Sequence, residues 1–162
     1  MSFKSFYGLS CNPFDKQSMQ VKDSFESEDQ KAMMNRLSYL KDVRGIGVFT
    51  AAPGMGKSHC LRCFEASLNK SLYDMRYICL STISVGEFYK QLCEELGLET
   101  KGGKTIMFKA IQDRILYLFK EKKQPLILAI DEAQYLGNAV LKDLKMLMNF
   151  SYDSMNCFTL IL

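Results

Sequence analysis

The stretch from Ile46 to Ser58 constrains the fold of this chain more than any other. It begins with a short apolar run that has strand character and continues into the turn-forming segment Ala-Ala-Pro-Gly-Met-Gly. After Lys57 and Ser58, apolar residues recur at helical spacing as far as Leu68. The sequence therefore predicts a strand, a tight loop and a helix in direct succession, which is the arrangement of a phosphate-binding loop.

The residue types of this loop suit a polyphosphate. Glycines let successive backbone N–H groups turn toward an anion, and the start of the following helix adds the positive end of its dipole. We expect Lys57 to reach the β and γ phosphates and the Ser58 hydroxyl to bind Mg²⁺. Ala51 stands where the consensus has its first glycine, a position that needs room more than a positive φ. The residues expected to contact the nucleotide are Ala52, Pro53, Gly54, Met55, Gly56, Lys57, Ser58 and His59.

A second motif follows a buried strand. Residues 126–130 are five consecutive apolar residues, as in a central strand of a parallel sheet, and Asp131 and Glu132 come directly after them. Ligands of such sheets bind at the carboxyl ends of the strands. We expect Asp131 to hold Mg²⁺, directly or through water, and Glu132 to deprotonate the water that attacks the γ-phosphate. Lys57 and Glu132 are thus the predicted catalytic residues. The alternative for the Asp-Glu pair is structural, because an isolated pair of this kind more often only begins a helix.

The same residues separate classes of nucleotide-binding protein. GTP-binding switches usually recognise guanine with an Asn-Lys-x-Asp element, and the nearest match, residues 69–72, lacks the acid. A small-molecule kinase does not need a glutamate that activates water. Hydrolysis of ATP is therefore favoured, with ATP and Mg²⁺ as the predicted cofactors.

Composition sets the remaining limits. A chain of 162 residues with 48% apolar content predicts one α/β domain with a core of its own. The net charge of +3 neither demands nor excludes nucleic acid. No apolar run approaches the roughly 18 residues of a membrane span, and the first residues lack a signal peptide, so we expect a cytoplasmic protein. Cys60 and Cys63 stand beside His59, but without a second pair at metal spacing they are predicted to pack in the core.

Residues 1–26 are rich in aromatic side chains and are predicted to pack on the ATPase core as irregular structure. They could supply an apolar wall for a nucleotide base or only cover the core, and both interpretations stay open. Residues 27–162 form the predicted α/β domain. Its first helix begins with Ser27 as N-cap and Gln30 three residues later, and it ends near Gly45. Further elements are expected at 76–80 (strand), 85–97 (helix), 105–122 (helix), after Asn138 as a helix cap, and at 157–162 (strand).

Taken together, these motifs carry a resemblance to a known family. The chain resembles the ExeA-type AAA+ ATPases. The resemblance rests on residues 6–9 and 12–14, the phosphate loop (Walker A), and residues 130–134 (Walker B) with the leucines after them. That group includes the secretion ATPase ExeA and the TniB and IstB type helper ATPases of transposons. The resemblance spans nearly the whole chain. It implies a three-layer α/β/α sandwich with a mostly parallel sheet in the strand order 5-1-4-3-2, ATP bound between subunits, and a homo-oligomer that forms on ATP binding.

The chain departs from this family at its C-terminal side. In the family a polar sensor residue follows the fourth strand, and an arginine finger and a helical lid come later, whereas here the last arginine is Arg114 and the sequence ends at Leu162. We therefore expect the N-terminal part of an AAA+ domain, with its C-terminal part missing. An arginine finger contributes about 10³-fold or more to such reactions, so this chain alone is expected to bind ATP and hydrolyse it poorly.

The resemblance divides the function between classes. The favoured interpretation is a transposition helper that assembles on duplex DNA with ATP and recruits a transposase. Its candidate DNA contacts are Lys101, Lys104, Lys120, Lys122 and Lys123. The alternative is an ATPase that energises protein secretion, as ExeA does. A third, non-enzymatic interpretation is a binding module that ATP switches on and hydrolysis resets.

Overall fold

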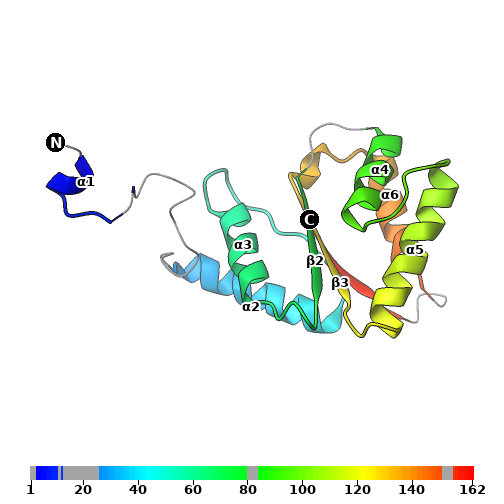
Figure 1. Cartoon of the computed structure of the whole chain (residues 1–162), viewed down its shortest axis with the longest axis horizontal. Coiled ribbons are helices and arrows are strands. Elements are labelled where there is room, and N and C mark those ends of the chain that lie inside the picture. The colour runs from blue at the N-terminus through cyan, green and yellow to red at the C-terminus, as the bar shows by residue number, and fades with distance from the viewer. Residues whose placement is uncertain (1–2, 11, 13–25, 80–83, 151–154) are drawn as a thin grey trace.

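Four parallel strands form one sheet in the order β1-β4-β3-β2, with helices on both of its faces (Figure 1). The structure is a computed structural model that describes residues 3–10, 12, 26–79, 84–150 and 155–162. Its elements are α1 (Phe3–Phe6), α2 (Glu28–Val43), β1 (Ile46–Gly47), α3 (Lys57–Ser67), β2 (Asp74–Cys79), α4 (Val85–Glu95), α5 (Lys104–Lys120), β3 (Leu126–Asp131), the 3₁₀ helix η2 (Ala133–Tyr135), α6 (Asn138–Leu147) and β4 (Phe158–Ile161). Over the described residues this is the predicted strand order without a fifth strand. The predicted α/β/α fold is confirmed.

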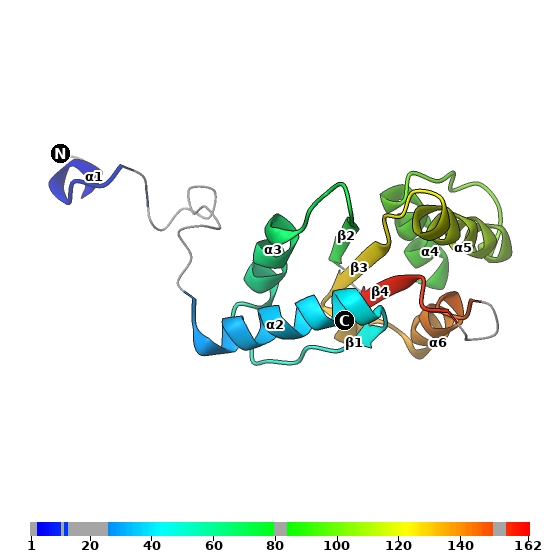
Figure 2. The ribbon, with the colours of Figure 1, turned by 90° about the horizontal axis from the view of Figure 1, so that it is seen from below.

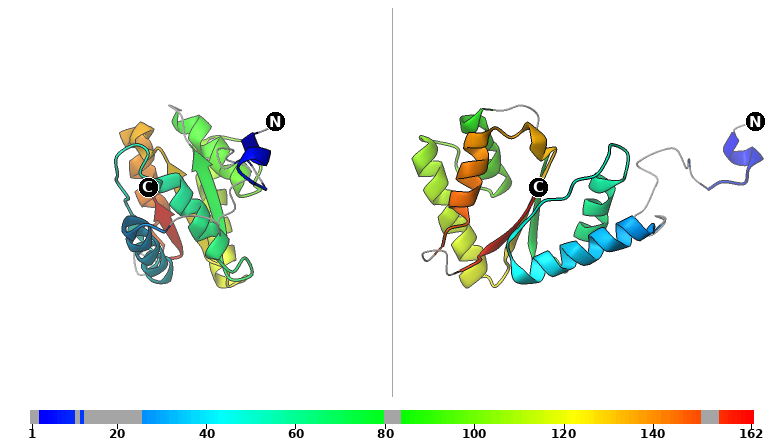
Figure 3. Two further views of the ribbon diagram at one scale, coloured as in Figure 1. Left: turned by 90° about the vertical axis from the view of Figure 1, so that its left-hand side faces the viewer. Right: turned by 180° about the vertical axis from the view of Figure 1, so that it is seen from behind.

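Alternation along β3 assigns each side chain to one layer. Ile127 and Ala129 pack with α2 and α3, whereas Leu126, Leu128 and Ile130 pack with α4, α5 and α6. Figure 3 shows these two helical layers on either side of the strands. Since successive side chains alternate, Asp131 continues the series of 127 and 129 and faces the layer that contains α3.

The layer of α2 and α3 holds the loop between β1 and α3 in place. Ser27 caps α2 as predicted, because its hydroxyl oxygen accepts from the backbone N–H of Gln30 at 3.1 Å. Leu37 and Leu40 of α2 and Phe64 of α3 are buried against the sheet. Figure 2 shows α2 running beneath the sheet beside β1 and β4. This packing fixes where the first turn of α3 begins.

Several element boundaries differ from the predicted ones. The apolar run before the loop is a strand only at 46–47, although the N–H of Phe49 still donates to the Leu162 carbonyl at 2.8 Å. The strand predicted at 76–80 begins two residues earlier, and residues 80–83 lie outside the described part of the chain. Asn138 is the first residue of α6 and not its cap. Gly137 has the extended N-cap backbone instead, and its carbonyl accepts from Val140.

The described part of the N-terminal segment lies apart from the sheet. α1 has no buried residue and stands away from the other helices in Figures 1 and 2. Phe6 and Tyr7 are 72% and 70% exposed, and their rings contact each other edge to face with centroids 4.9 Å apart. The predicted packing of this segment on the core gains no support from these residues. Phe14 and Phe25, which belonged to the same prediction, lie outside the described residues.

The described part of the chain contains reduced cysteines and no membrane-spanning helix. The described cysteines, at positions 60, 63, 79, 93 and 157, are all free thiols. Cys60 and Cys63 are buried, and the Sγ of Cys63 lies 3.4 Å from Nε2 of His59. Over the residues that the structure describes, no helix has the length and apolar character needed to cross a membrane.

Candidate functional site

The loop between β1 and α3 has the backbone that its glycines predict. Gly54 and Gly56 both have φ of +81°, in the left-handed region that side chains with a Cβ disfavour. Gly56 is the N-cap of α3, and Lys57 is the first helical residue. The loop therefore delivers the N-terminus of an eleven-residue helix to the edge of the sheet where β3 ends, with its free N–H groups at that edge.

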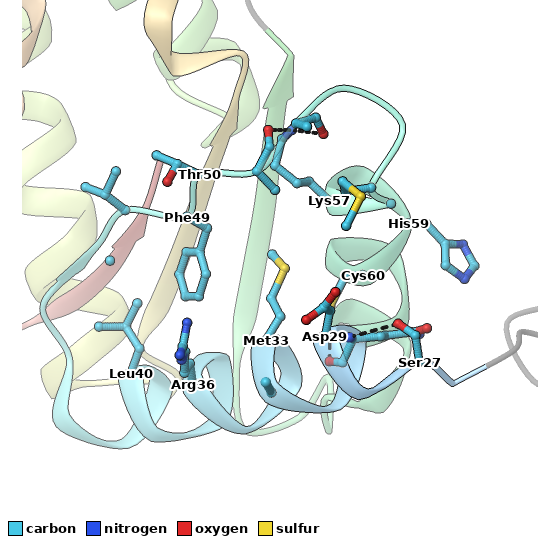
Figure 4. A pocket seen from close by; sticks show the side chains of 18 of the residues that line it. Ser27, Asp29, Met33, Arg36, Leu40, Phe49, Thr50, Lys57, His59 and Cys60 are labelled. Carbon is cyan, nitrogen blue, oxygen red and sulfur yellow. Dashed lines mark hydrogen bonds between the residues drawn. The ribbon is translucent and has the colours of Figure 1, made fainter.

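Lys57 lies over the backbone of this loop. Its Nζ donates to the carbonyl of Ala51 at 2.7 Å and is 3.3 Å from that of Ala52 (Figure 4). The ammonium thus already stands at the concave side of the loop, held by two neutral acceptors. A phosphate is a stronger acceptor for an ammonium than a carbonyl, so an entering phosphate would replace these contacts.

Ser58 and Asp131 meet at the foot of the loop, although they are 73 residues apart in the chain. The Ser58 hydroxyl donates to Oδ2 of Asp131 at 2.5 Å. Oδ1 of the same carboxylate accepts the backbone N–H of Glu132 at 2.9 Å, and the Tyr77 hydroxyl donates to Oδ2 at 2.8 Å. A hydroxyl and a carboxylate are hard oxygen ligands of the kind Mg²⁺ prefers, so these residues fit a magnesium ion.

These contacts set the protonation state of the site. Burial raises the pKa of Asp131, but hydrogen bonds from Ser58, Tyr77 and the Glu132 N–H, with the charge of Lys57, outweigh it and lower the pKa overall. The carboxyl group is therefore ionised at neutral pH. Burial and the hydrogen bond to Asp131 raise the pKa of Tyr77, so the phenol stays neutral and donates its proton.

Glu132 is turned outward by its backbone. Its φ of 57° and ψ of 36° are left-handed, which is uncommon for a residue with a side chain, and they redirect the chain from β3 into η2. The carboxylate is exposed at the edge of the sheet, and Nε2 of Gln134 donates to its Oε2. The predicted base thus lies next to the predicted metal ligand but points to solvent.

A cavity of about 670 Å³ lies between α2, the loop and the first turn of α3 (Figure 4). This volume is within the range of about 300–1,000 Å³ that small-molecule sites occupy. Of the eight residues predicted to contact nucleotide, those that line it are Ala52, Met55, Gly56, Lys57 and His59. Pro53 and Gly54 are outside its lining, and Ser58 faces Asp131 instead.

Sequence reasoning missed several residues of this site. The sequence patterns assign Tyr77 only to a strand and Gln134 only to a motif. The α2 side of the cavity, which includes Ser27, Gln30 and Arg36, was not foreseen. For Tyr77 a signal existed, since it lies on the second strand, which the implied order puts beside the third.

The lysines expected to contact DNA do not gather on one surface. Lys101 and Lys104 lie at the start of α5, and the other three lie at or beyond its end. A helix of 17 residues is about 25 Å long, so it separates the two groups. Lys104 is also paired with Asp143 at 2.6 Å. The structure therefore lends no support to a single basic face built from these residues.

The sequence of the chain is similar to a known protein family and to a known individual protein. Residues 40–162, most of the chain and all of the site except the lining residues before Leu40, match the family described as AAA domain. The chain is also similar to "General secretion pathway protein A" of Aeromonas hydrophila, with 28% identity over 163 residues. That alignment covers 99% of this chain but 29% of the relative, so the chain spans less than a third of that protein's length. By its fold, its loop and this match, the chain belongs to the AAA domain family.

Proposed function

We propose that this chain is the nucleotide-binding part of an AAA+ ATPase that hydrolyses ATP. The observation that carries the proposal is the contact of Ser58 with Asp131 at 2.5 Å, because it joins the end of the phosphate loop to the end of the buried strand. The loop N–H groups and Lys57 bind the β and γ phosphates, and the cavity beside α2 takes the base and sugar. Ser58 and Asp131 would hold Mg²⁺, which would supply positive charge beside the phosphates.

Glu132 serves as the base of this reaction. Glu132 follows Asp131 at the same edge of the sheet, and its exposed carboxylate is accessible to a water that would attack the γ-phosphate. As the water attacks, Glu132 accepts its proton, and Gln134, which donates to the same carboxylate, fixes the carboxylate's orientation. Lys57 stabilises the charge that develops on the transferred phosphoryl group.

The second part of the proposal concerns the process that this ATPase serves. We favour the secretion alternative over transposition, since the relative is named for a general secretion pathway and aligns with 99% of this chain. The ATPase would assemble into a homo-oligomer on ATP binding, as AAA domains do, and pass the energy to a secretion machine. Duplex DNA and a transposase are the less supported partners, because the candidate lysines are split between the two ends of α5.

The catalytic part is tested with Glu132→Gln in the full-length protein. We expect this variant to bind ATP as the wild type does and to lose hydrolysis, because an amide cannot accept the proton. Phosphate release is measured beside ATP binding, and Glu121→Gln, a change of the same kind after α5, is the control. Normal hydrolysis by Glu132→Gln would show that another group is the base.

The process is tested in the cell that carries the gene. If the protein serves secretion, Glu132→Gln in the chromosomal copy lowers the amount of secreted protein in the medium, and the control variant does not. Unchanged secretion, together with ATP-dependent duplex binding that weakens steeply with salt, would reverse the choice in favour of the DNA-bound helper.

A further inference from the structure

Tyr77 reaches the predicted metal ligand from the neighbouring strand. In the register of β2 and β3 it pairs with Ala129, two residues before Asp131 and on the same face of the sheet. An aromatic side chain is long enough to reach such a diagonal neighbour. Its hydroxyl donates to Oδ2 of Asp131 at 2.8 Å. We infer that Tyr77 is a positioning residue that fixes the Asp131 carboxylate for Mg²⁺, an inference that rests on the proposed function.

The hydrogen bonds leave one oxygen of Asp131 free for the metal site. Each carboxylate oxygen accepts about two hydrogen bonds. Oδ2 is filled by Ser58 at 2.5 Å and Tyr77 at 2.8 Å, whereas Oδ1 accepts, among the contacts of the described residues, the N–H of Glu132 at 2.9 Å. The remaining position on Oδ1 can accept from a water on the metal.

Two anchors from different elements are needed to hold this orientation. Ser58 comes from α3 and Tyr77 from β2, so two different elements hold Oδ2 of the carboxylate. Ser58 would itself be a ligand of Mg²⁺, so its oxygen would be shared between the ion and this contact. Tyr77, by contrast, would hold the Asp131 carboxylate without contacting the metal itself. Hydrogen-bond partners of this kind typically contribute about 10- to 100-fold to metal affinity or activity.

Tyr77→Phe tests this role because it keeps the ring and removes the hydroxyl. The measurement is binding of a fluorescent ATP analogue by the chain, in EDTA and at increasing Mg²⁺. We expect the affinity in EDTA to stay within about twofold of the wild type, and the Mg²⁺ concentration for half-maximal tightening to rise about tenfold. Mn²⁺, titrated in place of Mg²⁺ and followed by its electron paramagnetic resonance signal, should show the same loss.

Tyr117→Phe is the matched control. Tyr117 is exposed to a similar extent, 44% against 39% for Tyr77, and it lies on α5 in the opposite layer. We expect it to leave both the EDTA affinity and the Mg²⁺ dependence unchanged. Equal effects of the two substitutions would mean that Tyr77 has no special role at the metal, and would overturn the inference.

The outcomes separate this inference from the proposed function. If the wild type binds the analogue more tightly with Mg²⁺ and Tyr77→Phe behaves identically, the positioning role is wrong and the nucleotide site stands. An equal loss of affinity in EDTA and in Mg²⁺ would assign Tyr77 to the packing of the site and also overturn the inference. Absence of Mg²⁺-dependent binding by the wild type would instead refute the proposed function, and the inference with it.

Discussion

Replacing Ser58 by alanine removes the hydroxyl that joins the start of α3 to the end of β3. In the free protein this hydroxyl donates to Asp131 at 2.5 Å, so its loss leaves Oδ2 with Tyr77 as its remaining donor among the described contacts. The prediction is therefore a loss of stability without any nucleotide present. Ser58→Thr keeps a hydroxyl at the same position and is the control.

The magnitude follows from the exposure of the pair. A hydrogen bond to a charged group contributes about 1.5–3 kcal/mol when it is shielded from water. Ser58 is exposed and Asp131 is half-buried, so solvent screening reduces this to about 1 kcal/mol. For a chain of 162 residues that corresponds to a melting temperature about 2–4 °C lower.

A double-mutant cycle isolates this contact from other effects of the substitution. Urea unfolding in EDTA is measured for the wild type, Ser58→Ala, Asp131→Ala and the double variant. We expect the two losses of unfolding free energy to be non-additive by about 1 kcal/mol, because either change alone breaks the same hydrogen bond. A coupling below about 0.3 kcal/mol would refute the reasoning, since it would mean that the two side chains do not interact in solution.

Further predictions concern the same site and its support. Because the folded-state pKa of Asp131 is lowered, its ionised form stabilises the fold above the unfolded pKa of about 3.9 and ceases to do so as pH falls through the lower folded value. The difference in unfolding free energy between the wild type and Asp131→Asn should thus stay level above about pH 5 and shrink as the pH falls through the unfolded pKa of about 3.9 toward the lower folded value, and a constant difference over this range would contradict the assignment. Gly56→Ala should lower the free energy of urea unfolding by about 1–2 kcal/mol, because the φ of Gly56 is +81°. The control Gly86→Ala, inside α4, should be neutral or stabilising by up to about 1 kcal/mol. Equal effects of the two substitutions would argue against the left-handed backbone of the loop. Phe64→Ala should lower the free energy of unfolding by about 3–5 kcal/mol in the same assay, because this α3 side chain is fully buried between α3 and the sheet. A loss below about 1 kcal/mol would show that α3 does not pack on the sheet as described.

The backbone of the loop between β1 and α3 and the buried strand before Asp131 could be predicted because their signals are local. A glycine-rich turn between an apolar run and a helical repeat specifies its own backbone, and both glycines adopt it. Five consecutive apolar residues specify a strand buried on both faces, and every residue from 126 to 130 is buried. The meeting of Ser58 and Asp131 followed from these two elements once both were placed at the carboxyl edge of one sheet.

The rest depends on tertiary pairing, which the sequence patterns do not contain. Tyr77 reaches Asp131 only through the register of β2 with β3, and no periodicity fixes that register. The cavity depends on how α2 docks against the loop. Conversely, the lysines of 101–123 are close in sequence, but α5 holds the two groups about 25 Å apart. The structure thus lends no support to one DNA-binding surface built from these lysines.

Calorimetric titration of ATP tests most directly whether the loop between β1 and α3 holds a nucleotide. It compares the wild-type chain with Lys57→Ala, each with Mg²⁺ and with EDTA, and with GTP in place of ATP. We expect saturable ATP binding by the wild type that Mg²⁺ strengthens, weaker binding of GTP, and no measurable binding by a folded Lys57→Ala. Equal ATP binding by Lys57→Ala and the wild type, or no binding by either, would contradict the assignment of this loop as the nucleotide site.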